Sequence, residues 1–141
     1  MAPNAVSIAQ AHFHREAWFR GIFANDEPVG FAMLEDWTQC PEEAPADWRA
    51  APYIALWRFM IDARFQSRGY GAHALRLLIE HARKRPGASA MLLSYVPGDG
   101  SAEPFYRRFG FVETGEVDEG ERVMRLAFAG VPISMGCFSD N

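Results

Sequence analysis

The fold of this chain is decided by the stretch WRFMIDARFQSRGYGAHALRLLIE, which occupies residues 57–80. Up to Ile61 the residues are mostly large or β-branched, as in a buried strand, and after Ala72 apolar residues recur at helical spacing. Between these runs, residues 66–71 form a short turn that contains two glycines. The stretch therefore predicts a strand, a tight turn and a helix.

The turn offers a site for an anion, because the first four backbone N–H groups of a helix have no partner within it. These groups and the helix dipole attract phosphate, and glycine lets the backbone approach it closely. The dinucleotide fingerprint tolerates Ala74 at its third glycine, but the acidic residue that it requires about twenty positions later is absent. The nucleoside-triphosphate loop is absent too. We expect a pyrophosphate here, and a plain strand-to-helix turn is the alternative.

A second motif follows between Pro97 and Phe111. It has the form Asp-x-x-Ala-x-x-Phe-Tyr-x-x-x-Gly-Phe, made by Asp99, Ala102, Phe105, Tyr106, Gly110 and Phe111. With both motifs in view, the chain resembles the Gcn5-related N-acetyltransferase (GNAT) family. The family's Gln/Arg-x-x-Gly-x-Gly/Ala signature is matched by Gln66, Gly69 and Gly71. The second signature is matched except that Asp99 replaces the usual asparagine.

Within this family, residues 57–62, 111–116 and 123–126 look most like bacterial diamine and spermidine/spermine acetyltransferases. The resemblance implies an α/β fold with a mixed, mostly antiparallel central sheet, flanked by helices and containing one splayed parallel strand pair. It also implies that acetyl-coenzyme A binds where those two strands separate.

The resemblance assigns cofactor-binding roles residue by residue. Backbone groups of the strand end would contact the pantetheine arm and the acetyl carbonyl, and the turn would hold the pyrophosphate, with the Arg68 side chain adding positive charge. The strand residues are Phe59, Met60 and Ile61; the turn residues are Gln66, Ser67, Arg68, Gly69, Tyr70, Gly71 and Ala72. Asp99 would also lie near the cofactor, where its charge weakens binding, so we expect Asp99→Asn to lower the dissociation constant.

The resemblance also implies the catalytic groups. Tyr106 matches the family tyrosine that protonates the departing thiolate, and a phenol can serve as that general acid. The alternative for Tyr106 is a core aromatic residue of an amphipathic helix. A strand N–H near Ile61 is the natural donor to the oxyanion. The base is open: Glu35 and Asp62 are candidates by their positions at strand ends.

Composition limits the class of protein. At 141 residues, with 49% apolar and 23% charged residues, the chain fits one soluble domain, which we assign to residues 1–130, with an unassigned tail at 131–141. No apolar run is long enough to cross a bilayer and no leader is recognisable, so a cytoplasmic location is expected. Cys40 and Cys137 have no spacing that indicates a disulfide framework or a metal site.

The remaining elements are predicted from periodicity and turn residues. A short helix is expected at residues 4–14, a hairpin at 17–24 and 29–34, a helix from Gly69 to about Arg85, a strand at 90–96, a short helix at 101–109, and a closing hairpin at 111–117 and 121–128. The acidic segment from Glu35 to Arg49, with Pro41 and Pro45, is expected to be a loop. It is either a solvated surface or a source of negative potential near an acceptor pocket.

By comparison with the family, we expect this chain to lack the first strand and the first helix. The strand at residues 18–24 would then lie at a sheet edge, which proteins usually cover. We expect a second copy of the chain, as a homodimer, or the tail beyond Gly130 to cover it.

The predicted function is acetyl transfer from acetyl-coenzyme A to a primary amine, such as a polyamine or another small cationic amine. The net charge of −4 disfavours nucleic acid as a partner. Two alternatives remain at this point. One is a non-catalytic acyl-coenzyme A-binding module, and the other is an acetyltransferase acting on an aminoglycoside, an amino acid or a protein N-terminus.

Overall fold

The computed structural model describes residues 16–38, 40–44 and 53–128. The helix expected at residues 4–14, residues 45–49 of the acidic segment and the tail expected beyond Gly130 lie outside these ranges. Within them, no helix is long and apolar enough to cross a membrane.

The described residues form one six-stranded sheet with the order β1-β2-β3-β4-β6-β5. Its strands are β1 (Ala17–Ala24), β2 (Glu27–Asp36), β3 (Tyr53–Ile61), β4 (Ala90–Tyr95), β5 (Val112–Asp118) and β6 (Glu121–Ala127). All neighbouring pairs are antiparallel except β3 and β4, which are parallel. This confirms the predicted mixed, mostly antiparallel sheet.

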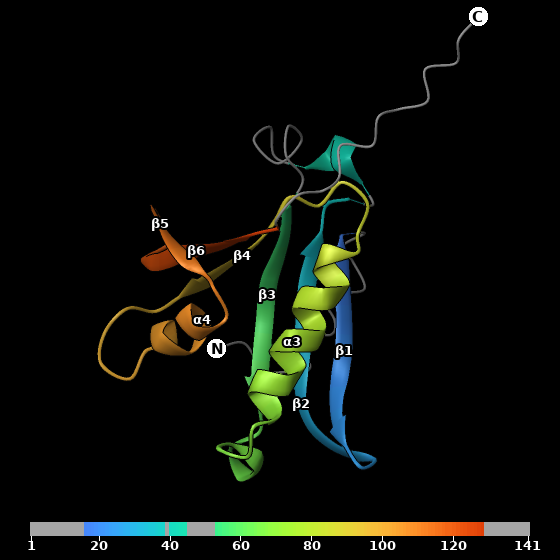
Figure 1. The fold of residues 1–141 in the computed structure, drawn as a ribbon, viewed down its shortest axis with the longest axis vertical. Helices are drawn as coiled ribbons and strands as arrows, with labels where there is room; N and C mark the ends of the chain where they lie inside the picture. The colour runs from blue at the N-terminus through green and yellow to red at the C-terminus, as the bar shows by residue number, and fades with distance from the viewer. Residues whose placement is uncertain (1–15, 39, 45–52, 129–141) are drawn as a thin grey trace, which may run out of the picture.

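The parallel strands β3 and β4 separate part-way along their length. They pair only from Tyr53 opposite Ala90 to Leu56 opposite Leu93. Beyond Leu56, β3 continues to Ile61 and pairs there with β2 alone among the described strands. In this part, residues 58–61 of β3 lie antiparallel to residues 30–33 of β2. Figure 1 shows the gap between the β1–β3 part and the β4–β6 part of the sheet. The predicted splayed pair is therefore present.

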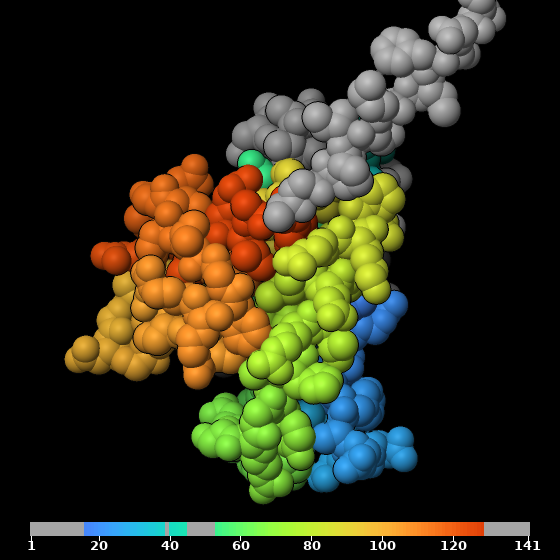
Figure 2. All heavy atoms as spheres, in the orientation of Figure 1, coloured from blue at the N-terminus to red at the C-terminus, as the bar shows by residue number. Residues whose placement is uncertain are grey.

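Helix α3 (Tyr70–Arg83) lies across the face of β1 to β3, and α4 (Glu103–Arg108) lies beside β4 and β5 (Figure 1). Two 3₁₀ turns, η1 (Pro41–Glu43) and η2 (Ala63–Phe65), complete the elements. Figure 2 shows α3 exposed along one side, with α4 and β5 on one flank and the β1–β2 hairpin on the other.

The core joins both parts of the sheet. Helix α3 buries the apolar residues that recur at helical spacing, namely Ala74, Leu75, Leu78, Ile79 and Ala82. All of these except Ala74 pack in one cluster with residues of β2, β3, β4 and β6, and with Tyr106 and Phe111. This cluster holds α4 against the sheet and so fixes where Tyr106 lies.

Both hairpins turn on two residues with positive φ, as tight hairpins require. In the first, Asn25 and Asp26 have φ of 48° and 69°; in the second, Glu119 and Gly120 have φ of 48° and 83°. Both predicted hairpins are confirmed. Strand β2 begins at Glu27, so Glu27 and Pro28 belong to the strand rather than the turn.

The predicted loop beginning at Glu35 is wrong at its start, because Glu35 and Asp36 are the last residues of β2. Asp36 is 1% exposed. Its Oδ2 lies 2.7 Å from Arg85 Nε, and its Oδ1 accepts a hydrogen bond from the Thr38 backbone N–H at 3.0 Å. A buried carboxylate needs such partners. The acidic composition of the segment gave no sign of these partners, because Arg85 lies far away in the sequence.

Candidate active site

The turn between β3 and α3 forms one wall of a cavity of about 860 Å³. We call it the turn cavity. It is lined by Phe59, Met60, Ile61, Ala63, Phe65, Gln66, Ser67, Gly69, Tyr70, Gly71, Ala72, Ala102, Phe105, Tyr106 and Arg108. The unpaired end of β3, the start of α3 and the short helix α4 thus meet at one place.

The start of α3 fits a phosphate group. Gly69 is the N-cap with φ of 83°, and no side chain caps the helix. The His73 N–H bonds to the Gly69 carbonyl at 3.1 Å, so the N–H groups that precede it on the first turn lack intrahelical partners. A Cβ on Gly71 would lie 3.7 Å from Ile61 Cγ1 and 3.9 Å from Phe105 Cζ. The space left by that missing Cβ lies in the cavity wall and allows a ligand to approach the backbone.

Two side chains shape the connection from β3 to α3. Gln66 Nε2 donates to the Ile61 carbonyl at 3.0 Å, which ties the turn back to the strand end. Asp62 Oδ1 accepts from the Arg64 backbone N–H at 2.9 Å and caps η2. Hydrogen bonds from the Arg64 side chain and backbone lower the pKa of the Asp62 carboxyl. Both contacts hold the turn in the shape that opens the first turn of α3 to the cavity.

Most residues predicted to bind the cofactor line the turn cavity, but two of them do not. Arg68 points toward the buried Phe65, with its guanidinium carbon 5.6 Å from the ring centroid. Asp99 is exposed on the loop after β4 and lies outside the cavity wall. The cavity adds Arg108, which the sequence analysis missed. The sequence contained an indication of this role, because Arg108 is a basic residue only two positions after Tyr106, near the same end of α4.

Tyr106 lies between two cavities. Besides the turn cavity it lines a second one of about 670 Å³, which we call the tyrosine cavity. The side chain is 9% exposed and packs against Phe111 with ring centroids 6.0 Å apart. Burial raises the pKa of the Tyr106 phenol, so the group stays protonated at neutral pH. A protonated phenol at the junction of two cavities can donate a proton to a ligand that spans them.

The tyrosine cavity adjoins a third space of about 810 Å³. We call it the acidic groove, after its carboxylates Glu35, Glu116, Asp118, Glu119 and Glu121. The groove and the tyrosine cavity share Leu56, Trp57, Arg58, Ser94, Glu119 and Glu121. Of these carboxylates the sequence analysis gave a site role to Glu35 alone. The acidic run from Glu116 to Glu121 was a usable signal, because it surrounds the turn of the closing hairpin.

The two candidate bases are separated from Tyr106. Glu35 lines the acidic groove but neither of the cavities that Tyr106 lines. Asp62 lines none of these three spaces and is engaged by Arg64. Among the described residues, no group of three or more His, Cys, Asp or Glu side chains could hold a metal ion.

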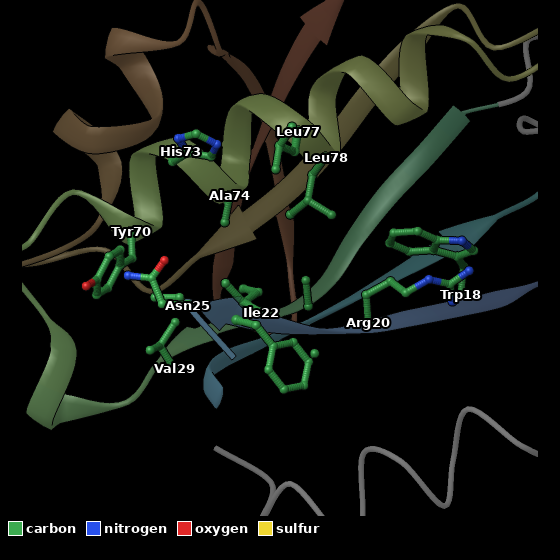
Figure 3. Close-up of a pocket in the computed structure, with 14 residues that line it drawn as sticks. Trp18, Arg20, Ile22, Asn25, Val29, Tyr70, His73, Ala74, Leu77 and Leu78 are labelled. Atoms are coloured by element: carbon green, nitrogen blue, oxygen red, sulfur yellow. The ribbon is translucent and has the colours of Figure 1, made fainter. Parts of the chain in front are cut away.

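A further cavity of about 550 Å³ lies between β1, β2 and α3 (Figure 3). Its wall is mainly apolar, with Trp18, Ile22 and Leu78 facing the space, and no carboxylate lines it. Neither Tyr106 nor any residue of β3 or β4 belongs to this wall. The groups suited to chemistry therefore gather at the three connected spaces instead.

The sequence model described as the acetyltransferase (GNAT) family matches residues 3–111. The chain belongs to the GNAT family. Two relatives resemble it over 116 residues, which is 82% of this chain and 71% of each relative. The spermine/spermidine N(1)-acetyltransferase of Bacillus subtilis strain 168 is 31% identical, and the probable spermine N(1)-acetyltransferase of Bacillus subtilis subsp. natto is 30% identical. The chain is an acetyl-coenzyme A-dependent N-acetyltransferase.

Solved structures share the GNAT fold. A PaiA N-acetyltransferase from Thermoplasma acidophilum in complex with coenzyme A is 20% identical, with a TM-score of 0.61 over 87% of this chain and 68% of that chain. The ribosomal-protein-S18-alanine N-acetyltransferase of Escherichia coli is 19% identical, with a TM-score of 0.66 over 94% of this chain and 83% of that chain. At these identities the likeness concerns the fold.

Proposed function

We propose that this GNAT enzyme acetylates a polyamine or another small cationic primary amine. The observation that carries the proposal is the acidic groove, which begins at the tyrosine cavity and extends away from the turn. An amine acceptor carries positive charge at neutral pH, and carboxylates along a groove raise its local concentration and hold its distal ammonium groups. Two arginines, Arg58 and Arg125, also line the groove, so five carboxylates face two guanidinium groups.

The names of the two Bacillus relatives support the same acceptor class, since both are described as acting on spermine. The rival acceptors, an aminoglycoside, an amino acid or a protein N-terminus, have no comparable support among the described residues. An amino acid would bring its own carboxylate into a groove that already carries an excess of negative charge.

On the cofactor side, we assign the pyrophosphate of acetyl-coenzyme A to the N–H groups at the start of α3. The missing Cβ of Gly71 and the open helix end support this assignment. Backbone groups of Phe59, Met60 and Ile61 would contact the pantetheine arm, because no described strand pairs with that side of β3. Roles for Arg68 and Asp99 stay predictions from the resemblance.

Tyr106 serves as the general acid in this proposal. Transfer requires the amine nitrogen to attack the thioester carbon and the sulfur to leave as a thiolate. The buried phenol lines both the turn cavity and the tyrosine cavity, so it can reach the sulfur of a cofactor that enters from the turn. Proton donation from it prevents the release of a charged thiolate into a buried site.

A panel of acceptors tests the function. Free thiol release should be fastest with spermine or spermidine, slower with a short monoamine, and slowest with an amino acid. Replacing three groove carboxylates together (Glu116→Gln, Asp118→Asn, Glu119→Gln) should raise KM for spermine about tenfold, at roughly a factor of two or three for each exposed charge. Their effect on KM for a monoamine should be smaller, because it lacks distal ammonium groups.

The matched control is Glu80→Gln, since Glu80 lies on the exposed side of α3 outside the three spaces. It should leave both KM values unchanged. Faster turnover of an aminoglycoside or an amino acid than of any polyamine would contradict the acceptor assignment.

A further inference from the structure

A polar side chain of β4, Ser94, stands where the two strands separate at the active site. Ser94 is the first residue of β4 beyond the last pair with β3, which is Leu56 opposite Leu93. Its hydroxyl donates a hydrogen bond to Glu121 Oε2 at 2.8 Å. Glu121 is the first residue of β6, and β6 pairs with β4 next to this position, with Ser94 opposite Val123. This hydrogen bond therefore ties the Glu121 carboxylate to the neighbouring strand β4.

Ser94, Glu121 and Tyr106 line the same tyrosine cavity. Glu119, the other carboxylate of this cavity, is exposed on the turn of the closing hairpin and is not among the residues bonded to Ser94. Glu121 is only partly exposed and also lines the acidic groove. A cationic acceptor that moves from the groove toward Tyr106 thus passes Glu121 at the entrance to the fork.

We propose that Glu121 is the general base of this enzyme and that Ser94 positions its carboxylate. The inference rests on the proposed function, because it assumes an ammonium acceptor in the acidic groove. A base must lie within hydrogen-bond reach of the proton it removes, directly or through one water. Of the carboxylates in the described residues, Glu121 combines a place in the tyrosine cavity with a hydrogen bond to an adjoining strand.

The protons balance in this scheme. The Glu121 carboxylate takes one proton from the acceptor ammonium group and passes it to solvent. The neutral nitrogen then attacks the thioester carbon, so that an N–C bond forms, the C–S bond breaks, and Tyr106 gives its proton to the sulfur. The nitrogen loses its second proton as the amide forms, and this proton restores the phenol. The products are the N-acetylated amine, free coenzyme A and one released proton.

One cation faces the same cavity. Arg58 of β3 lines both the tyrosine cavity and the acidic groove, and its Nη1 donates to the Trp57 carbonyl at 3.0 Å. A guanidinium near the reacting nitrogen disfavours the ammonium form of the acceptor. Arg58 therefore assists the proton transfer to Glu121, while the more distant carboxylates of the groove hold the remaining ammonium groups.

The test compares two acceptors with the Glu121→Gln variant of the whole chain. With spermidine, which is protonated at neutral pH, kcat should fall about 100-fold or more, as expected for a lost general base, and KM should change little. With methoxyamine, which is already neutral, kcat of the variant should stay within about threefold of the wild type, since no proton must be removed before attack. A structural defect would lower both rates equally.

Ser94→Ala should lower kcat for spermidine about tenfold, the effect of losing one hydrogen bond to a charged group, and should spare methoxyamine. Glu119→Gln should raise KM for spermidine and keep kcat, as expected for a carboxylate that only binds. Circular dichroism and the dissociation constant of coenzyme A show whether each variant is folded, and both should match the wild type.

Two results overturn the assignment of Glu121. One is a Glu121→Gln enzyme that keeps its kcat for spermidine, and the other is an equal loss with both acceptors. A wild-type protein that binds coenzyme A but acetylates no amine would instead contradict the proposed function and the base together. The two failures are therefore distinguishable.

Discussion

At the scale of single residues, the account depends most on Tyr106. Its ring packs against Phe111 in the core, and the residue lines both the turn cavity and the tyrosine cavity. Removing only the oxygen should therefore preserve the packing and abolish the proton donor. We expect Tyr106→Phe to lower kcat about 100-fold or more, with little change in the affinity for coenzyme A or in Tm.

The matched control for this variant is Tyr95→Phe, which removes a phenol oxygen that bonds to Glu113 outside the three connected spaces. It should keep kcat near the wild-type value. If Tyr106→Phe also kept kcat within about threefold, Tyr106 would be a core aromatic residue and another group would protonate the sulfur.

Gly71 is the second residue that bears on the account directly. A Cβ at this position would meet its neighbours at ordinary contact distances, so we expect a larger side chain to be compatible with folding but to protrude into the cavity. Gly71→Val should raise the dissociation constant of coenzyme A about tenfold or more while Tm stays close to the wild type. Calorimetric titration measures the first and thermal unfolding the second.

Leu77→Val is the control for Gly71→Val, because it places the same β-branched residue on the exposed side of the same helix. It should leave coenzyme A binding unchanged. If the Gly71→Val variant bound coenzyme A with the same affinity as the wild type, the start of α3 would not be part of the binding site.

At the scale of elements, the contact between β1 and α3 includes a titratable group. The imidazole of His81 stacks on Trp18 with ring centroids 4.3 Å apart, and its Nε2 is buried without a hydrogen-bond partner among the described residues. Burial lowers the pKa of His81, Arg85 and Arg20 lower it further, and Asp36 opposes them. The folded state therefore favours the neutral ring.

This shift predicts how stability depends on pH. Because the folded pKa lies below the unfolded value of about 6.5, the unfolded chain binds more protons in this range, and stability falls as the pH drops below about 6.5. We expect Tm to fall between pH 7.5 and pH 5.5. His81→Phe, which keeps a ring against Trp18, should reduce this fall.

Thermal unfolding at several pH values between 5.5 and 7.5 measures the effect. Leu77→Val, on the same helix, carries no titratable change and should follow the wild type. Identical pH profiles for the wild type and the His81→Phe variant would show that the imidazole stays solvated.

The elements were predictable because their signals are local. Helical spacing of apolar residues located α3, and turn residues between apolar runs located the hairpins. The end of β2 was not predictable in this way. Asp36 is stabilised in the strand by Arg85, which follows the C-terminal end of α3, and composition alone favours a loop there.

The candidate site shows the same contrast between local and long-range signals. Its cofactor side is one continuous stretch, so the motif identified it, whereas the acidic groove is assembled from β2, β3, β4 and the closing hairpin. Arg68 and Asp99 show the limit of a motif, since a sequence pattern does not fix side-chain direction. The hydrogen bond between Ser94 and Glu121 joins residues 27 positions apart and could be recognised only from coordinates.

At the scale of the whole molecule, β1 and β5 are the edge strands of the sheet in the described residues. Phe23 on β1 is 65% exposed and lies at the cavity beside α3, where Leu77 is 55% exposed. The homodimer predicted from the sequence would cover such an edge, and it stays a prediction. Light scattering should give twice the mass of the chain, and Phe23→Glu should shift it toward the monomer. A wild-type monomer at all concentrations would contradict the prediction.

The central claim is that the start of α3 holds a diphosphate and thereby places a thioester beside Tyr106. A crystal structure of the complex with coenzyme A tests it most directly. We predict the pyrophosphate on the backbone N–H groups of residues 67–72, with the sulfur about 3–4 Å from the Tyr106 hydroxyl, close to the reach of a proton donor. A pyrophosphate bound elsewhere, or a sulfur beyond the reach of that hydroxyl, would contradict the account.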